Sequence, residues 1–287
     1  MSTFKRATRT KAKLRLALIG PAGSGKTRSA LELATGLGGR IALIDSERGS
    51  GDLYADLFEY DTVQLEPPFT PKKYIDALRE AEDAGYASVI IDSLTHAWAG
   101  EGGILDILDT TTRASSSRNS FQAWREVTPQ QDRLVNACLG AKLHVIGTIR
   151  TKTAYEIVED DRGKKAPKKI GLAPVQRQGL EYEFTVVLDL DADSHIATAS
   201  KDRTGLFDGR HFVITAATGR ELAAWLDSGT EPVERIDPYA DWKEAIRQCT
   251  TLEDLGKLWS QMSGEQRLAC AEAKDDRKEA FAQAEAA

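Results

Sequence analysis

The chain has 287 residues, a formal net charge of −6, 41% hydrophobic residues and 29% charged residues. This composition is ordinary for a globular protein, and the acidic balance excludes a chain that coats nucleic acid with its whole surface, although it leaves room for a local basic groove. No apolar run approaches the length of a membrane span, and the first residues lack the apolar core of a signal peptide. The three cysteines are widely spaced and form no C-x-x-C pair, which is typical of reduced thiols. From these two observations together we expect a cytoplasmic protein without membrane contact.

The first predicted strand, residues 14–19, leads directly into Gly20-Pro-Ala-Gly-Ser-Gly-Lys-Thr27, and residues 28–34 have the pattern of a starting helix. The pattern G-x-x-x-x-G-K-[ST] between a strand and a helix is typical of a phosphate-binding loop, whose backbone N–H groups surround phosphate oxygens. In such a loop the lysine contacts the β- and γ-phosphates and the hydroxyl residue binds Mg²⁺. The sequence therefore predicts that the chain binds ATP and Mg²⁺ through Gly20, Pro21, Ala22, Gly23, Ser24, Gly25, Lys26, Thr27 and Arg28.

Apolar strands and helices alternate after this loop. One helix is predicted from Thr70-Pro71, which supplies an N-cap and a proline at the first helical position, to Gly85, and another covers residues 122–139. Strands are predicted at residues 41–44, 88–91, 143–149, 184–190, 195–200 and 212–214, of which the last three are more exposed. This alternation predicts an α/β fold, with helices on both faces of a mostly parallel sheet and ligands beyond the carboxyl ends of its strands.

Polar residues at the ends of the predicted strands are candidates for hydrolysis chemistry. Asp92 is placed to hold Mg²⁺, the alternative being a carboxylate that caps the next helix. Glu47 is a candidate base for the attacking water, and a plain loop carboxylate is its alternative. A further strand ends in Thr148 and Arg150, where a polar side chain either contacts the γ-phosphate or lies at an exposed strand end.

These segments resemble the RecA/DnaB superfamily of ATPases. The phosphate loop resembles that of RecA, Ile44-Asp-Ser-Glu47 resembles the segment with the catalytic glutamate, Val89-Ile-Ile-Asp-Ser93 resembles the Walker B strand, and Ile149-Arg-Thr-Lys152 is similar to the stretch before the DNA-binding loop. The resemblance covers about residues 13–228. It implies a RecA-like P-loop NTPase core that hydrolyses ATP to ADP and phosphate, with Glu47 as the base. RecA has a glutamine where this chain has Thr148, which puts coupling of DNA contact to hydrolysis through that residue in doubt.

Two further positions take roles from the resemblance. Lys201-Asp-Arg203, followed by Thr204-Gly205, looks like the Lys-x-Arg-x-Gly element of DnaB-type and KaiC-type ATPases, which reaches the γ-phosphate of a neighbouring subunit. This implies catalytic roles for Lys201 and Arg203 and assembly of the chain with itself, as a ring or a filament. Tyr54 resembles the adenine-stacking tyrosine of RecA, with one extra residue after Glu47; an ordinary core or surface aromatic is the alternative.

The segment after Arg150 has the densest positive charge. Residues 162–177 contain six basic residues and no acidic one, and we expect hairpin arms at residues 155–159 and 170–172 around Asp161-Arg-Gly163. Such a loop suits single-stranded DNA, with Tyr155 and Tyr182 as candidates for base stacking, whereas a solvated charged hairpin is the alternative. The candidate DNA contacts are Arg150, Lys152, Arg162, Lys164, Lys165, Lys168, Lys169 and Arg177. A second polar loop, residues 110–118, faces DNA or is a plain linker.

The chain divides into a flexible basic arm (1–12), the RecA-like core (13–228), a linker (229–240) and a small helical segment (241–287). In the last part we expect helices at residues 241–248, from Thr251 to Met262 and from Ser263 to about residue 283. Five apolar residues can bury against one another there: Trp242, Leu252, Leu255, Leu258 and Trp259. Docking of a partner protein and a lid that only stabilises the core are both compatible with this pattern.

The short core is most similar to phage-encoded RecA-like ATPases, which act with single-strand-binding protein in annealing and recombination. The resemblance implies single-stranded DNA and further copies of the chain as partners, single-strand-binding protein as another, and the cytoplasm of a bacterial host as the location. Two other functions stay open. A ring-type DNA helicase or translocase has the same active site, and a P-loop ATPase or kinase without nucleic acid shares the phosphate loop.

Overall fold

The computed structural model describes residues 4, 6–115, 119–159, 165–231 and 237–286, without the side chains of residues 155–170, 279, 283, 285 and 286. The chain forms two compact units, residues 1–231 and 232–287. The first contains β1 (Arg15–Gly20), α1 (Lys26–Leu37), β2 (Ile41–Asp45), the 3-10 helix η1 (Gly51–Tyr54), β3 (Asp61–Gln64), α2 (Pro71–Asp83), β4 (Ser88–Asp92), α3 (Leu94–Ala99), α4 (Ile104–Ala114), α5 (Ser120–Gly140), β5 (His144–Glu159), β6 (Lys165–Pro174), η2 (Leu180–Tyr182), β7 (Val186–Leu190), β8 (Ile196–Asp202), β9 (His211–Val213) and α6 (Ala216–Asp227).

The first unit is an α/β fold around a mostly parallel sheet, as the alternating pattern predicts. The strand order is β3-β2-β4-β5-β1-β7-β8-β9. The first six of these strands are mutually parallel, and β8 and β9 each run antiparallel to the strand before them. β5 lies between β1 and β4, so the phosphate loop and Asp92 belong to strands that are not direct neighbours.

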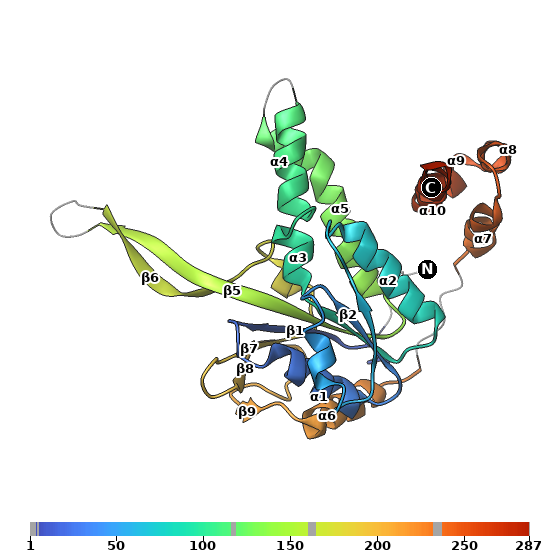
Figure 1. The fold of residues 1–287 in the computed structure, drawn as a ribbon. Helices are drawn as coiled ribbons and strands as arrows, with labels where there is room; N and C mark the ends of the chain where they lie inside the picture. Colours follow the sequence, from blue (N-terminus) through green and yellow to red (C-terminus); the bar gives the residue numbers. More distant parts are fainter. Residues whose placement is uncertain (1–3, 5, 116–118, 160–164, 232–236, 287) are drawn as a thin grey trace. The chain divides into compact units, whose positions relative to one another are not determined.

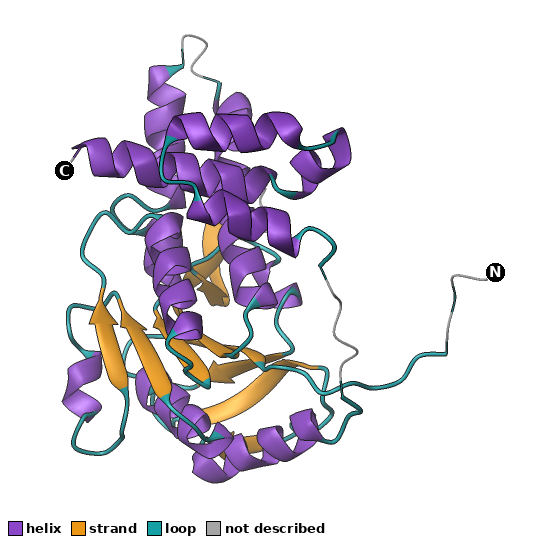
Figure 2. Cartoon of the chain, turned by 90° about the vertical axis from the view of Figure 1, so that its right-hand side faces the viewer, coloured by secondary structure: helices purple, strands orange, loops and turns teal. Residues whose placement is uncertain are grey.

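Helices cover both faces of this sheet (Figures 1 and 2). Ala17 and Ile19 of β1 pack with α2 and α5 on one face. Leu16 and Leu18, the alternate residues of the same strand, pack with α1 and α6 on the other face. This is the two-residue period of a strand that is buried on both sides.

The predicted hairpin exists and is longer than expected. β5 continues beyond the sheet and pairs antiparallel with β6 from Thr151–Pro174 to Glu159–Lys165. The two strands form a ribbon that projects away from the sheet in Figure 1. Nine paired residues of β5 span about 30 Å at the usual rise per residue. The expected turn, Asp161-Arg-Gly163, lies outside the described residues.

Three other segments differ from expectation. Residues 110–114 belong to α4 rather than to a polar loop, because the apolar residues that precede them start a helix that packs along α5. β3 was not expected, since its four residues are all exposed and form no apolar run. β7 is more buried than predicted, because it lies between β1 and β8 and not at an edge.

The end of the basic arm is held against the segment after α6. Thr10 bridges to Thr230, Lys11 N donates to the Thr230 carbonyl oxygen at 2.8 Å, and the Arg9 guanidinium lies 3.9 Å from the centroid of the Trp225 ring. Residues 9–11 are therefore not the loose arm that the sequence suggests, and the first residues of the expected linker pair with them.

The second unit contains α7 (Ala240–Gln248), α8 (Leu252–Gln261), α9 (Gly264–Ala269) and α10 (Ala271–Ala286). Thr251 and Ser263 cap α8 and α9 as expected. The long last helix of the prediction is instead two helices that meet at Cys270, and Leu252 is 51% exposed rather than buried. The core of this unit consists of Ile246, Cys249, Leu255, Met262 and Cys270.

Two glycines set the distance between α1 and α6, and thereby the position of the chain segment before α6. A methyl group on Gly219 would lie 2.3 Å from the Leu33 carbonyl oxygen and 2.7 Å from Gly36 Cα. Such distances are below any normal contact, and backbone atoms cannot move aside as a flexible side chain can.

We expect Gly219→Ala to lower the free energy of unfolding by about 1–3 kcal/mol, the usual cost of overpacking. Chemical denaturation of the full chain measures this change. Gly140→Ala, in α5, is the control, since its methyl group meets no atom within 4 Å. Equal stability of the two variants would contradict the close contact.

Candidate functional site

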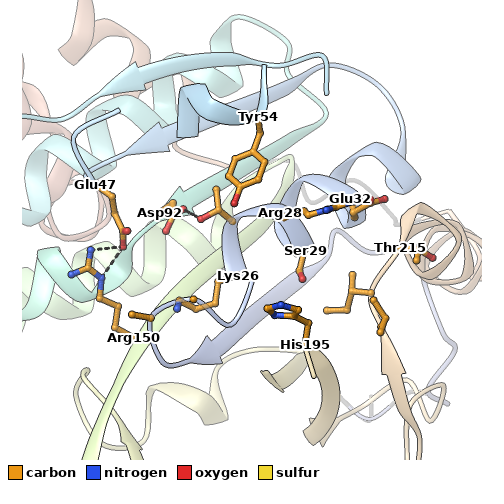
Figure 3. A pocket seen from close by; sticks show the side chains of 16 residues that line it. Lys26, Arg28, Ser29, Glu32, Glu47, Tyr54, Asp92, Arg150, His195 and Thr215 are labelled. Atoms are coloured by element: carbon orange, nitrogen blue, oxygen red, sulfur yellow. Dashed lines mark hydrogen bonds and ion pairs between the residues drawn. The ribbon is translucent and has the colours of Figure 1, made fainter. Parts of the chain in front are cut away.

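A cleft of about 750 Å³ opens at the carboxyl ends of the parallel strands (Figure 3). Its walls come from the phosphate loop, the start of α1, the ends of β2 and β4, the β7–β8 turn and the segment between β9 and α6. The lining residues are Ala22, Gly23, Gly25, Lys26, Thr27, Arg28, Ser29, Glu32, Glu47, Tyr54, Asp92, Arg150, His195, Val213, Ile214 and Thr215.

The predicted phosphate loop forms one wall of this cleft. Gly23 and Gly25 have φ angles of 78° and 83°, in the left-handed region that suits glycine, and the loop ends in the N-terminus of α1. Gly20, Pro21 and Ser24 do not line the cleft; they shape the loop, for example through the buried Ser24 hydroxyl, which donates to the Pro21 carbonyl oxygen at 2.9 Å.

Lys26 folds back on the loop that carries it. Its Nζ donates to the carbonyl oxygens of Gly20 at 3.0 Å and Pro21 at 2.7 Å. Burial lowers the pKa of Lys26, and the carboxylates of Asp92 and Glu47 counteract part of this shift. Lys26 lines the cleft together with these two acidic residues.

Asp92 lies at the centre of the polar end of the cleft. Its Oδ2 accepts a hydrogen bond from the Thr27 hydroxyl at 2.6 Å, and its Oδ1 accepts one from the Thr148 hydroxyl at 2.5 Å. Burial raises the pKa of Asp92, and the nearby charge of Glu47 raises it further. The adjacent Thr27 and Asp92 oxygens are ligands of the kind that Mg²⁺ prefers. Among the described residues no group of three or more His, Cys, Asp or Glu could hold a metal ion.

Thr148 has a different place from the one expected. It is fully buried, donates to Asp92 and is not among the residues that line the cleft, so a direct nucleotide contact stays a prediction. The position of β5 between β1 and β4 turns the Thr148 hydroxyl toward the neighbouring strand end.

Glu47 and Arg150 form an ion pair inside the cleft. Both Nε and Nη2 of Arg150 lie 2.8 Å from Glu47 Oε1, and the two side chains face each other in Figure 3. The loop behind Glu47 is held by Asp45, which accepts from the backbone N–H groups of Glu47 at 2.5 Å and Gly51 at 3.0 Å. Arg150, a candidate both for the γ-phosphate and for DNA, lines the cleft.

The comparison with protein families agrees with this geometry. A family model described as AAA domain matches residues 12–224, about three quarters of the chain. The chain belongs to this AAA domain family. No curated protein matches the sequence. The first unit is therefore an AAA-type P-loop ATPase domain, a class that binds nucleotide, usually with Mg²⁺.

Lys201 and Arg203 lie away from the cleft of this AAA domain. Lys201 Nζ donates to the Glu181 carbonyl oxygen at 3.1 Å, and Arg203 Nη2 donates to that of Tyr182 at the same distance. The backbone N–H of Arg203 donates to the Thr185 carbonyl oxygen. The backbone N–H of Thr185 donates in turn to the carbonyl oxygen of Arg15, at the start of β1. The phosphate loop follows the other end of β1, about 16 Å away at the usual rise per strand residue.

The other candidates for DNA contact are dispersed. Lys152 is exposed at the root of the ribbon, whereas Arg177 pairs with Asp132 of α5 at 2.9 Å. Lys165, Lys168 and Lys169 belong to β6, and their side chains are not described. Arg162 and Lys164 lie outside the described residues.

Several lining residues of the cleft were not predicted. Ser29 and Glu32 of α1 carry no signal beyond the helical pattern, and Val213, Ile214 and Thr215 resemble any exposed strand end. His195 was assigned to a strand but lies in the β7–β8 turn. Its position after Asp191-Ala-Asp-Ser is the one available hint, since such polar clusters favour turns. No helix among the described residues is long and apolar enough to span a membrane.

Proposed function

We propose that the AAA domain hydrolyses ATP and that Glu47 is the base that activates the attacking water. The observation that carries this proposal is the common cleft: Glu47 lines it together with Lys26, Thr27 and Asp92. Bound Mg²⁺ would neutralise charge on the phosphates, with Thr27 and Asp92 as its protein ligands. Lys26 contributes a second positive charge, and the Glu47 carboxylate orients water and takes its proton.

The pair between Glu47 and Arg150 is part of this proposal. One carboxylate oxygen accepts both contacts from the guanidinium group, which fixes the orientation of the carboxyl group in the cleft. Arg150 is half-exposed, with 42% of its side chain accessible, so it can also approach the terminal phosphate.

We expect Glu47→Gln to retain ATP affinity and lose turnover by about a hundredfold or more, since general-base catalysis contributes in this range. Lys26→Ala should lose both binding and turnover, because it removes a charge that contacts ATP in the ground state. Equilibrium ATP binding and phosphate release measure the two quantities, and Glu80→Gln on α2 is the control. Turnover of Glu47→Gln within a few-fold of the parent protein would remove Glu47 from the base role.

We propose further that the chain acts on single-stranded DNA, as RecA-like proteins do in annealing and recombination. The basic density of residues 162–177 supports this, as does the β5–β6 ribbon, whose strand β6 contains Lys165, Lys168 and Lys169. β5 runs without interruption from Thr148 and Arg150 into the ribbon, which gives a contact on the ribbon a direct path to the cleft. Single-strand-binding protein is the further partner that such a role implies.

Replacing Lys164, Lys165, Lys168 and Lys169 together by glutamine should weaken binding of a single-stranded oligonucleotide. The slope of log affinity against log salt concentration should flatten by up to about 3, since each contact to a single strand contributes about 0.7. Fluorescence anisotropy over a salt series measures this. The control replaces four lysines elsewhere: Lys72, Lys142, Lys243 and Lys257. An unchanged slope would mean that the ribbon is exposed to solvent and does not contact the oligonucleotide.

We also propose that Arg203, with Lys201, completes the ATP site of a neighbouring copy of the chain. The distance between these residues and the cleft of their own chain supports a role in trans over one in cis. An arginine supplied in trans contributes on the order of a thousandfold or more to turnover in related phosphoryl-transfer sites.

Mixing Lys26→Ala with Arg203→Ala should restore part of the ATPase activity that each variant lacks. Some interfaces of the mixture then combine an intact phosphate loop with an intact arginine. Steady-state phosphate release over a titration of one variant into the other measures the recovery. Co-assembled variants without any recovery would contradict a shared site.

A further inference from the structure

The strand order divides the cleft into two halves with different chemistry. Asp92 ends β4 and Glu47 follows β2, both on one side of β1. His195 and Val213 lie on the other side of β1, in the β7–β8 turn and at the end of β9. β4 and β7 are three strand spacings apart, or about 14 Å. A triphosphate that crosses the phosphate loop with its γ-phosphate at Asp92 therefore directs its nucleoside toward β7 and β9.

His195 is held in an unusual backbone conformation beside the phosphate loop. Its φ angle is 55°, in the left-handed region that non-glycine residues rarely adopt. A methyl group on Gly25 would come within 3.5 Å of His195 Nδ1, so the imidazole ring lies against the glycine that precedes Lys26. In Figure 3, His195 and Tyr54 lie on opposite sides of the start of α1.

The turn that carries His195 is fixed by Asp191. The Asp191 carboxylate accepts from the backbone N–H groups of Asp193 at 3.1 Å and Ser194 at 2.9 Å, and from the Ser194 hydroxyl at 2.7 Å. The backbone N–H of His195 donates to the Asp191 carbonyl oxygen at 3.1 Å. These bonds hold the ring at the cleft at the energetic cost of a left-handed residue, a pattern that is common at ligand sites.

An apolar surface continues this wall of the cleft. Val213 lines the cleft with 57% of its surface exposed, and Ile214 and Thr215 follow it. The wall is anchored to α1, because Glu32 accepts a hydrogen bond from the backbone N–H of Ala216 at 2.9 Å. The exposed apolar side chain of Val213, in the same cleft as the imidazole ring of His195, suits the face of a nucleobase better than a phosphate group.

We propose that His195 and Val213 form the wall of the cleft that binds the nucleoside part of the nucleotide, with the imidazole ring packing on the base or its ribose. The inference rests on the proposed binding of ATP and adds the residues that hold the end of the molecule away from the phosphates. It assigns to His195 a contact that contributes to affinity and not to the chemical step.

The test compares two ligands that share the phosphates and differ in the nucleoside, ATP and inorganic tripolyphosphate, each with Mg²⁺. His195→Gly should weaken ATP binding about tenfold or more, the usual effect of losing one stacking partner, and leave tripolyphosphate binding within about twofold. Val213→Ser, which removes apolar surface without adding charge, should show the same selectivity. Isothermal titration calorimetry of the full chain measures both dissociation constants.

The stability of the His195→Gly variant shows whether it folds normally. Glycine adopts a positive φ without strain, so the thermal unfolding midpoint of His195→Gly should equal or exceed that of the parent protein. Asp193→Gly, in the same turn but not among the residues that line the cleft, should bind both ligands normally.

Each other outcome has a defined meaning. Equal loss of ATP and tripolyphosphate affinity in His195→Gly would place the ring at the phosphates and overturn the inference, and unchanged ATP affinity would overturn it as well. A parent protein that binds neither ligand would refute the proposed ATP site itself, and with it this inference.

Discussion

The carboxylate of Asp92 joins the parts of the molecule on which the cleft depends. It is buried at the end of β4 and accepts one hydrogen bond from Thr27, at the start of α1, and one from Thr148, in β5. A buried carboxylate is costly unless such donors satisfy it, so each of these three segments constrains the other two. The hydrogen bond from Thr27 joins the start of α1 to the end of β4, although β5 separates β1 from β4.

β5 is the element that connects the cleft with the distant ribbon. Within a few residues it supplies Thr148, which holds Asp92, and Arg150, which pairs with Glu47, and it then leaves the sheet and pairs with β6. One strand therefore carries residues of the cleft and of the ribbon.

The opposite side of the cleft depends on helix packing. Gly36 and Gly219 allow α1 and α6 to approach closely, and Glu32 binds the first turn of α6. The segment from Val213 to Thr215 therefore has a fixed position relative to the phosphate loop. Asp92 and Glu47 belong to the side of β4 and β2, and the exposed Val213 belongs to the side of β9.

The sequence by itself determined the elements whose signals are local. The phosphate loop, the buried strands and Asp92 follow from short patterns, because apolar runs and glycine spacing act within a few residues of one another. It could not determine β3, which is short and exposed, nor the extent of α4, where packing against α5 overrides a polar sequence. The tertiary structure alone decided that Thr148 holds Asp92, that Arg150 faces Glu47 and that His195 reaches the phosphate loop. These contacts join strands, or loops that follow strands, far apart in the sequence, and strand order is set by the packing of the whole sheet, which no local pattern records.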